Sequence, residues 1–174
     1  MDRWVTRVYY SSTELNPMPG AEKTCFVIAP IGADGSVVRQ RSDQLFRHVI
    51  LPAAAECGYT QVHRADQLNR TGLITSQIME HLNRCDLVIA DLSDHNPNVF
   101  YELAVRHCFL KPAIPLIVYD QSIPFDLIQM RTIKYDLADP DAINNCRETV
   151  AATIRHLEQD PTGGVTCPPE ISPA

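Results

Sequence analysis

Apolar residues are gathered along this chain in short blocks that predict the strands of a sheet. Three blocks have no polar interruption, which is typical of strands covered on both faces: residues 25–29, 87–90 and 113–119. Two shorter blocks are expected to form the remaining strands, residues 59–63 and 132–136.

Helices are predicted between these strands by apolar residues that recur at the spacing of a helix turn. They are expected over residues 37–57, 73–83, 97–110 and 142–157, with a short one over 125–129. In the first of them, Ser36 is expected to cap the start, Pro52 to kink or divide the helix, and Gly58 to end it.

Strands that alternate with helices predict an α/β protein, with a parallel sheet of about five strands between two layers of helices. A strand order of 2-1-3-4-5, as in flavodoxin-like three-layer sandwiches, places the ligand crevice between the first and third strands. The loops that follow those strands, residues 30–36 and 92–98, then face each other. We expect residues 24–158 to form this domain, residues 1–23 an N-terminal arm or linker, and residues 159–174 a disordered tail or linker.

Composition narrows the choice of partners. The chain has 174 residues and a net charge of −6, which argues against a general nucleic-acid binder because phosphate backbones need clustered Lys and Arg. No apolar run approaches the roughly 20 residues that span a bilayer, and residues 1–7 lack the apolar stretch of a signal peptide. We therefore expect a cytoplasmic protein that binds neither nucleic acid nor a membrane. The Pro/Gly-rich end is typical of a piece cut from a multidomain protein, and we expect a homo-oligomer or a fusion to another domain.

The cysteines contain no CxxC pair and are predicted to be reduced and mostly buried: Cys25, Cys57, Cys85, Cys108, Cys146 and Cys167. A zinc site that combines them with His63, His81 or His107 stays open, although the spacing does not support it. We therefore predict no metal and no cofactor.

Residues 86–103 carry the strongest chemical signal. An apolar strand ends in Asp91, and a polar turn follows it. A helix then opens at Pro97, with Asn96 expected as its cap. Glu102 lies within the first two turns of that helix, beside aromatic residues.

Glu102 is the candidate for catalysis, because a carboxylate can attack the anomeric carbon of a ribose or stabilise an oxocarbenium-like transition state. A surface glutamate paired with Arg106 explains the same spacing. Asp91 is also predicted to be catalytic, by binding ribose hydroxyls or holding Glu102 in place. The alternative for Asp91 is a turn residue that accepts backbone N–H bonds.

Other residues near the predicted crevice are candidates for binding substrate. Arg39 and Arg41, with the backbone amides of the loop before them, are expected to hold a phosphate, although a solvated basic first turn explains them as well. That loop lacks the spacing of a Walker or Rossmann fingerprint. The predicted substrate contacts are Pro30, Ile31, Gly32, Arg39, Arg41, Ser93, Asp94, Asn98 and Tyr101.

A resemblance to the nucleoside 2-deoxyribosyltransferase-like superfamily rests on three segments: residues 26–32 (FVIAPIG), 86–93 (DLVIADLS) and 96–103 (NPNVFYEL). The TIR-like nucleotide hydrolases of bacterial defence systems are close structural relatives of that superfamily. The resemblance covers residues 24–136. It implies a flavodoxin-like fold and cleavage of an N-glycosidic bond, with Glu102 in the place of the catalytic glutamate.

Two departures from the family pattern bear on the substrate. Deoxyribosyltransferases carry an aspartate, the proton donor to the base, on the helix before the third strand, where this chain has Ile78 beside Gln77. A cationic nicotinamide leaves without protonation, so the missing acid favours NAD-type substrates over nucleosides. The glycine that often follows the Tyr-Glu-Leu segment is Ala104 here.

The sequence thus predicts an N-glycosidase that cleaves the base–ribose bond of NAD or a related nucleotide, with a role as a bacterial defence effector left open. A nucleoside or nucleotide N-ribohydrolase, or a 2-deoxyribosyltransferase, is the first alternative. The second alternative is a non-catalytic module that senses nucleotides or assembles as TIR-like domains do. NAD enters these hypotheses as a substrate and not as a cofactor.

Overall fold

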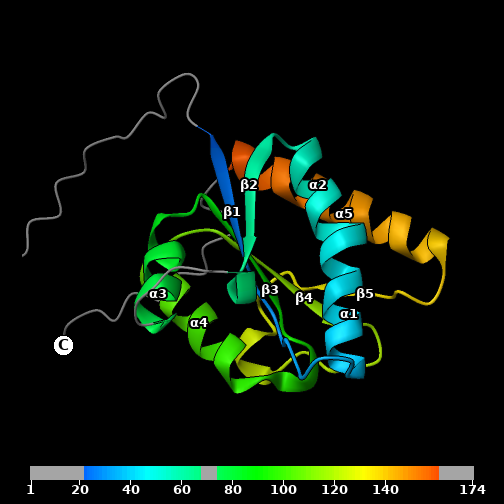
Figure 1. The fold of residues 1–174 in the computed structure, drawn as a ribbon. Coiled ribbons are helices and arrows are strands. Elements are labelled where there is room, and N and C mark those ends of the chain that lie inside the picture. Colours follow the sequence, from blue (N-terminus) through cyan, green and yellow to red (C-terminus); the bar gives the residue numbers. More distant parts are fainter. Residues whose placement is uncertain (1–21, 68–73, 161–174) are drawn as a thin grey trace, which may run out of the picture.

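The computed structural model describes residues 22–67 and 74–160, in which strands and helices alternate (Figure 1). The predicted arm and tail lie almost wholly outside these residues. The strands are β1 (Lys23–Ile28), β2 (Tyr59–Arg64), β3 (Leu87–Asp91), β4 (Ala113–Val118) and β5 (Ile133–Tyr135). The α-helices are α1 (Val37–Leu45), α2 (Leu51–Glu56), α3 (Ile74–Arg84), α4 (Pro97–Cys108) and α5 (Pro140–Gln159). Shorter helical turns are η1 (Phe46–Ile50), η2 (Ala65–Gln67), η3 (Ser93–His95) and η4 (Phe125–Leu127).

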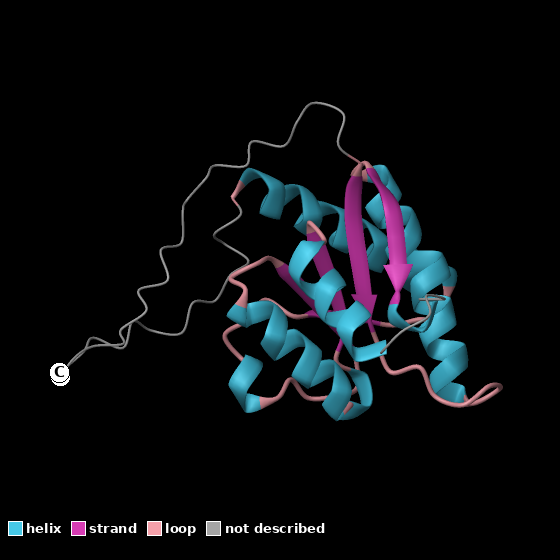
Figure 2. Ribbon diagram, turned by 60° about the vertical axis from the view of Figure 1, so that its left-hand side comes forward, coloured by secondary structure: helices cyan, strands magenta, loops and turns pink. Residues whose placement is uncertain are grey.

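The five strands form one parallel sheet in the order β2-β1-β3-β4-β5. This confirms the predicted α/β class and the flavodoxin-like strand order 2-1-3-4-5. The sheet lies between two layers of helices, with α1, η1, α2 and α5 on one face and α3 and α4 on the other (Figure 2). No helix in the described ranges is long and apolar enough to cross a membrane.

Each face of the sheet has its own hydrophobic core, because successive side chains of a strand point to opposite faces. In β3, Leu87 and Ile89 pack under α2 and α5, whereas Val88 and Ala90 pack under α3 and α4. Every residue of β3 is buried, which explains its unbroken apolar run. Asp91 continues the alternation of Leu87 and Ile89, so its side chain belongs to the face of the sheet opposite α4.

The predicted helix over residues 37–57 is confirmed, and it is divided by a wider turn that ends two residues before Pro52. Ser36 caps it, because the Ser36 hydroxyl accepts a backbone N–H of the first turn at 3.1 Å. The wider π-helical turn η1 separates α1 from α2, in which Pro52 is the second residue. Proline has no N–H to donate and its ring needs space, which a wider turn provides. Gly58, with a φ of 83°, follows the end of the helix as predicted.

A buried arginine joins the elements at the amino ends of β3 and β4. Arg106 of α4 is 0% exposed. Its guanidinium donates hydrogen bonds of 2.7–3.2 Å to the carbonyl oxygens of Leu82, Cys85, Asp86 and Pro112. Burial lowers the pKa of Arg106 to about 10, so the guanidinium remains charged at neutral pH. One side chain therefore ties the end of α3, the turn into β3 and the loop before β4 to α4.

Candidate functional site

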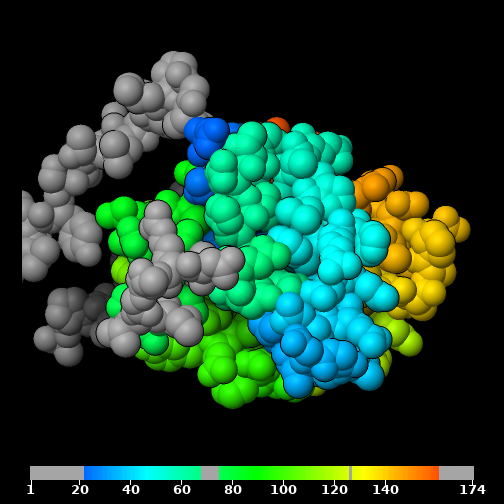
Figure 3. Space-filling model, in the orientation of Figure 1, coloured from blue at the N-terminus to red at the C-terminus, as the bar shows by residue number. Residues whose placement is uncertain are grey.

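The loops that follow β1 and β3 meet at the carboxyl edge of the sheet, as the predicted strand order requires. Arg41 of α1 forms an ion pair with Asp94 of η3, and its second terminal nitrogen donates to the other carboxylate oxygen at 3.3 Å. Figures 1 and 3 show the two segments, blue and green, side by side at the lower edge of the molecule. Ligands of open α/β sheets bind at this edge, so we place the candidate site here.

The turn between β3 and α4 has an unusual backbone. Asp94 has a φ of 59° and His95 a φ of 47°, in the left-handed region that few residues other than glycine adopt. The loop after β4 fixes both residues. The Asp94 N–H donates to Gln121 Oε1 at 2.7 Å, and His95 Nε2 lies 2.9 Å from the carbonyl oxygen of Ser122. Backbone strain of this kind persists where neighbouring groups hold it, and it is common at functional sites.

This turn sets the start of α4. Asn96 caps the helix by accepting the N–H of Asn98 at 3.0 Å, and Pro97 is the first helical residue, both as predicted. Asn98 and Tyr101 are exposed on the first turns of the helix. Their predicted contact with substrate is sterically open, and it stays a prediction.

Glu102 is the sixth residue of α4 and is half-buried. No hydrogen bond or ion pair reaches its carboxylate from the described part of the chain. Burial raises the pKa of Glu102 from 4.5 to about 7. The alternative of a solvated glutamate paired with Arg106 does not describe this side chain, because the Arg106 guanidinium is occupied by backbone carbonyls. A carboxyl group that titrates near neutrality is suited to chemistry at neutral pH.

Asp91 is fully buried in a small network of hydroxyl groups. Its carboxylate accepts the Ser93 hydroxyl at 2.5 Å, the Ser93 N–H at 3.1 Å and the Tyr135 hydroxyl at 3.2 Å. The Ser93 hydroxyl also accepts the N–H of Val118 at 3.0 Å. Burial raises the pKa of Asp91 above its ordinary value. These contacts favour the turn-forming alternative for Asp91, and its predicted role toward a ribose or Glu102 stays a prediction.

The two arginines predicted to hold a phosphate already have carboxylate partners. Arg39 lies 3.4 Å from Asp43 and 3.1 Å from Asp66, and Arg41 is paired with Asp94. A phosphate would therefore compete with these carboxylates. Of the loop residues before them, Pro30 is buried, Ile31 is partly buried and Gly32 is exposed.

Two polar residues of the site were missed by the sequence prediction, namely Gln121 and Tyr135. Gln121 also donates through its amide nitrogen to Asp94 at 3.1 Å, and Tyr135 binds Asp91 from the last strand. Both lie at or beyond the carboxyl end of a strand, as Asp91 does. That shared position is the signal that identifies them.

Gly32 allows the loop after β1 to pass close to the start of α1. Its φ is 67°, and a Cβ there would lie 2.6 Å from Ser36 Oγ and 2.9 Å from Val38 Cβ. Gly32→Ala is expected to displace the Ser36 cap and to lower the free energy of unfolding by about 3 kcal/mol. Gly35→Ala is the matched control, because Gly35 has a φ of 76° but a Cβ there meets nothing within 4 Å. Gly35→Ala is expected to lower the free energy of unfolding by about 1 kcal/mol, and urea unfolding measures both variants. Equal losses in Gly32→Ala and Gly35→Ala would contradict the proposed clash.

The raised pKa of Glu102 predicts a dependence of stability on pH. Above about pH 4.5, the unfolded chain releases the Glu102 proton while the folded chain retains it. The contribution of Glu102 to the free energy of unfolding is therefore fully present below that pH and is lost as the pH rises to about 7. At about pH 8, Glu102→Gln is therefore expected to exceed the wild type in free energy of unfolding by roughly 1–2 kcal/mol, allowing for solvent screening.

Urea unfolding at about pH 8 and about pH 4.5 measures this effect, and the two proteins are expected to be equally stable at the lower pH. Glu80→Gln, on the exposed face of α3, is the control. A stability difference that is the same at both pH values would show that Glu102 titrates normally.

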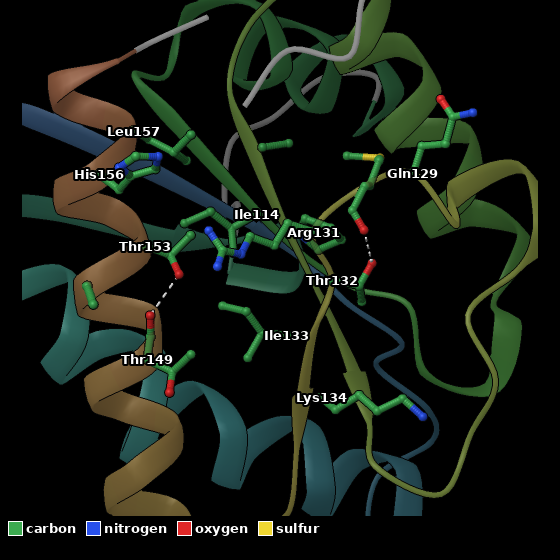
Figure 4. Close-up of a pocket in the computed structure, with 14 residues that line it drawn as sticks. Ile114, Gln129, Arg131, Thr132, Ile133, Lys134, Thr149, Thr153, His156 and Leu157 are labelled. Carbon is green, nitrogen blue, oxygen red and sulfur yellow. Dashed lines mark hydrogen bonds between the residues drawn. The ribbon is translucent and has the colours of Figure 1, made fainter. Parts of the chain in front are cut away.

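Two cavities lie elsewhere on the molecule. One, of about 660 Å³, lies between α5 and the amino ends of β4 and β5 (Figure 4), and another, of about 390 Å³, lies between α2 and β2. Glu102 lines neither of them. Within residues 22–67 and 74–160, no group of three or more His, Cys, Asp or Glu residues is placed to hold a metal ion. The described cysteines are free thiols, buried at Cys25, Cys57, Cys85 and Cys146 and exposed at Cys108, while Cys167 lies outside the described residues.

No protein-family model and no curated protein sequence matches this chain. Among solved structures, it is similar to a 2-deoxyribosyltransferase from the psychrotolerant bacterium Bacillus psychrosaccharolyticus, described as a biocatalyst for the synthesis of antiviral and antitumoral nucleosides. The TM-score is 0.50 and the identity 12%, over 73% of this chain and 95% of that one. A likeness at this identity concerns the fold, and it supports the predicted 2-deoxyribosyltransferase-like architecture. The resemblance to TIR-like hydrolases is not addressed by it and stays a prediction.

Proposed function

We propose that this chain breaks or transfers the N-glycosidic bond between the base and the ribose of a nucleoside or nucleotide, with Glu102 as the acting carboxylate. The observation that carries the proposal is the half-buried Glu102 side chain, with no partner among the described residues and a pKa raised to about 7. Its position near the start of α4, after the carboxyl end of β3, is where ligands bind in this fold. The similar solved structure, described as a 2-deoxyribosyltransferase, lends support through the shared architecture.

In the proposed reaction, the ionised Glu102 carboxylate attacks C1′ of the ribose or stabilises the positive charge that develops there. The C1′–N bond breaks, and its electron pair leaves with the nitrogen of the base. In hydrolysis, water then adds to C1′ and loses a proton to solvent, and any bond between Glu102 and C1′ breaks so that the carboxylate is released. In transfer, the nitrogen of a second base takes the place of water in the same step and loses its proton to solvent. The strained turn at Asp94 supports this chemistry by setting the position at which α4 begins.

The kind of base that can leave depends on whether the site has a proton donor close to the leaving nitrogen. A neutral base needs a proton on its nitrogen to leave, but nicotinamide leaves NAD as a neutral amide without one. The carboxylate that α3 carries, Glu80, is exposed and ion-paired with Arg84 at 2.8 Å. This favours a cationic base and hence NAD or a related nucleotide, as the sequence suggests. The architecture shared with a deoxyribosyltransferase favours a neutral nucleoside.

A panel of substrates tests the proposal. The purified chain is incubated with NAD, with nucleoside monophosphates, and with 2′-deoxynucleosides plus a free acceptor base, and the released base is measured by chromatography. We expect nicotinamide release from NAD that Glu102→Gln removes and Glu80→Gln retains. Release of purine or pyrimidine with NAD intact moves the substrate to neutral nucleosides and keeps the reaction type. No release from any substrate, at both dilute and concentrated protein, overturns the enzymatic proposal in favour of a non-catalytic nucleotide-sensing module.

A further inference from the structure

The larger cavity has the size and floor of a small-molecule site. Its volume of about 660 Å³ falls within the range of about 300–1,000 Å³ that is usual for such sites. It lies at the amino ends of β4 and β5, whereas Glu102 follows the carboxyl end of β3. The buried side chains that line it are apolar: Ala113, Ile114, Pro115, Met130, Ile133 and Leu157. A floor of this kind accepts the hydrocarbon part of a ligand.

The walls of the cavity carry basic side chains and no acidic ones. Arg131, Lys134 and His156 line it, and no Asp or Glu residue does. Figure 4 shows the Arg131 guanidinium extending across the cavity toward α5, on the side of Thr153. Lys134 is engaged elsewhere, because its ammonium donates to two carbonyl oxygens of the loop after β4, at 3.1 and 3.2 Å. Arg131 is therefore the cation that a ligand in the cavity would meet.

The donors of Arg131 are free within the described ranges, where the guanidinium has neither an ion pair nor a hydrogen bond. Neither Glu148 nor Glu158 of α5 lines the cavity, and Glu158 is paired with Lys23 at 2.8 Å. A planar guanidinium above an apolar floor matches a carboxylate or phosphate, which it binds through two parallel hydrogen bonds.

We propose that the cavity between β5 and α5 is a second ligand site, which takes a small organic anion with a carboxylate or phosphate head and a compact apolar body. Arg131 binds the head, and the buried side chains around Ile133 and Leu157 bind the body. The apolar body separates such a ligand from an inorganic anion, because the buried side chains of the floor are apolar. The site shares no residue with the proposed reaction at Glu102, so the two proposals stand or fall separately.

Two aromatic probes with one ring and different heads test the site in the full chain, followed by NMR titration of backbone amides. Benzoate and phenyl phosphate are the anions, and benzyl alcohol is the neutral control. We expect saturable shifts at residues 131–134 and 149–157, with at least one anion bound about tenfold or more tightly than the alcohol, as a charge-assisted hydrogen bond implies. The anion that binds more tightly assigns the head group as carboxylate or phosphate.

Four substitutions separate specific binding in the cavity from general attraction to a cation. Arg131→Gln is expected to lower the affinity for the anions about tenfold and to leave the affinity for the alcohol unchanged. Arg84→Gln, at an exposed position of α3, is expected to leave all three affinities unchanged. Ala152→Phe, which fills the cavity from α5, is expected to block all three probes, and Glu102→Gln to retain them. Shifts that do not saturate, or anion binding equal in the wild type and Arg131→Gln, would overturn the proposal. Thermal melting curves check that each variant is folded.

Discussion

Replacing Glu102 with glutamine is expected to lower the rate of base release by about a thousandfold or more. Glutamine keeps the size of the side chain, but its amide neither attacks C1′ nor offers a negative charge to an oxocarbenium-like transition state. The measurement is kcat/KM for the substrate that the panel identifies. Glu80→Gln is the matched control, because it makes the same chemical change on an exposed face of α3.

The pH profile of the wild type distinguishes the roles that a carboxyl group with a pKa of about 7 can take. Because the proposed acting form is ionised, kcat/KM is expected to rise with pH and to level off above about pH 7. A profile that falls above this pH would make Glu102 a proton donor instead. A rate in Glu102→Gln within a fewfold of the wild type would exclude the side chain from the reaction, and the higher stability expected for this variant at about pH 8 means that unfolding would not explain a loss.

Removing Arg106 is expected to cause the largest loss of stability of any change considered. Arg106→Leu keeps an aliphatic side chain but leaves buried carbonyl oxygens, including those of Leu82 and Cys85, without their donors. An uncompensated loss of this kind costs about 3–5 kcal/mol. Arg106→Lys keeps the charge but lacks the fork that reaches several carbonyls at once, so an intermediate loss is expected.

Urea unfolding followed by circular dichroism measures these losses. The control is Arg84→Leu, since Arg84 forms an exposed pair with Glu80 and such pairs contribute at most about 1 kcal/mol. A loss below about 1 kcal/mol in Arg106→Leu would mean that water replaces the guanidinium at these carbonyls. In that case Arg106 would not be the tie between α3, α4 and the sheet that its contacts indicate.

The fold was predictable because local patterns and connection rules act together. Unbroken apolar runs predicted the central strands β1, β3 and β4, and the intervening helices required a parallel arrangement. Ser36, Asn96 and Gly58 have the conformations that their residue types favour at helix ends. Pro52 predicted a kink or a division of the helix, but only the structure shows that it takes the form of the wider turn η1, which packs against α5.

The candidate site was predictable only in outline. The strand order predicted that the segments after β1 and β3 face each other, and the ion pair between Arg41 of α1 and Asp94 of the turn after β3 is consistent with this. The sequence did not reveal that Arg41 would be neutralised by Asp94, because the two residues are 53 positions apart. The sequence did not predict the contact of Gln121 with the same turn for a similar reason, because Gln121 lies in the loop after β4.

The amino-acid sequence by itself determined the order of strands and helices, their caps and the position of Glu102 near the start of α4, because these depend on neighbours within a few residues along the chain. Only the tertiary structure decided which charges are paired and which are not. Asp91 accepts a hydrogen bond from Tyr135, and Arg106 donates to backbone carbonyl oxygens. Glu102 is half-buried and has no partner in the described part of the chain. The physical reason is that burial and pairing are set by side chains that folding brings together from distant segments, and the pKa of a carboxyl group follows from them.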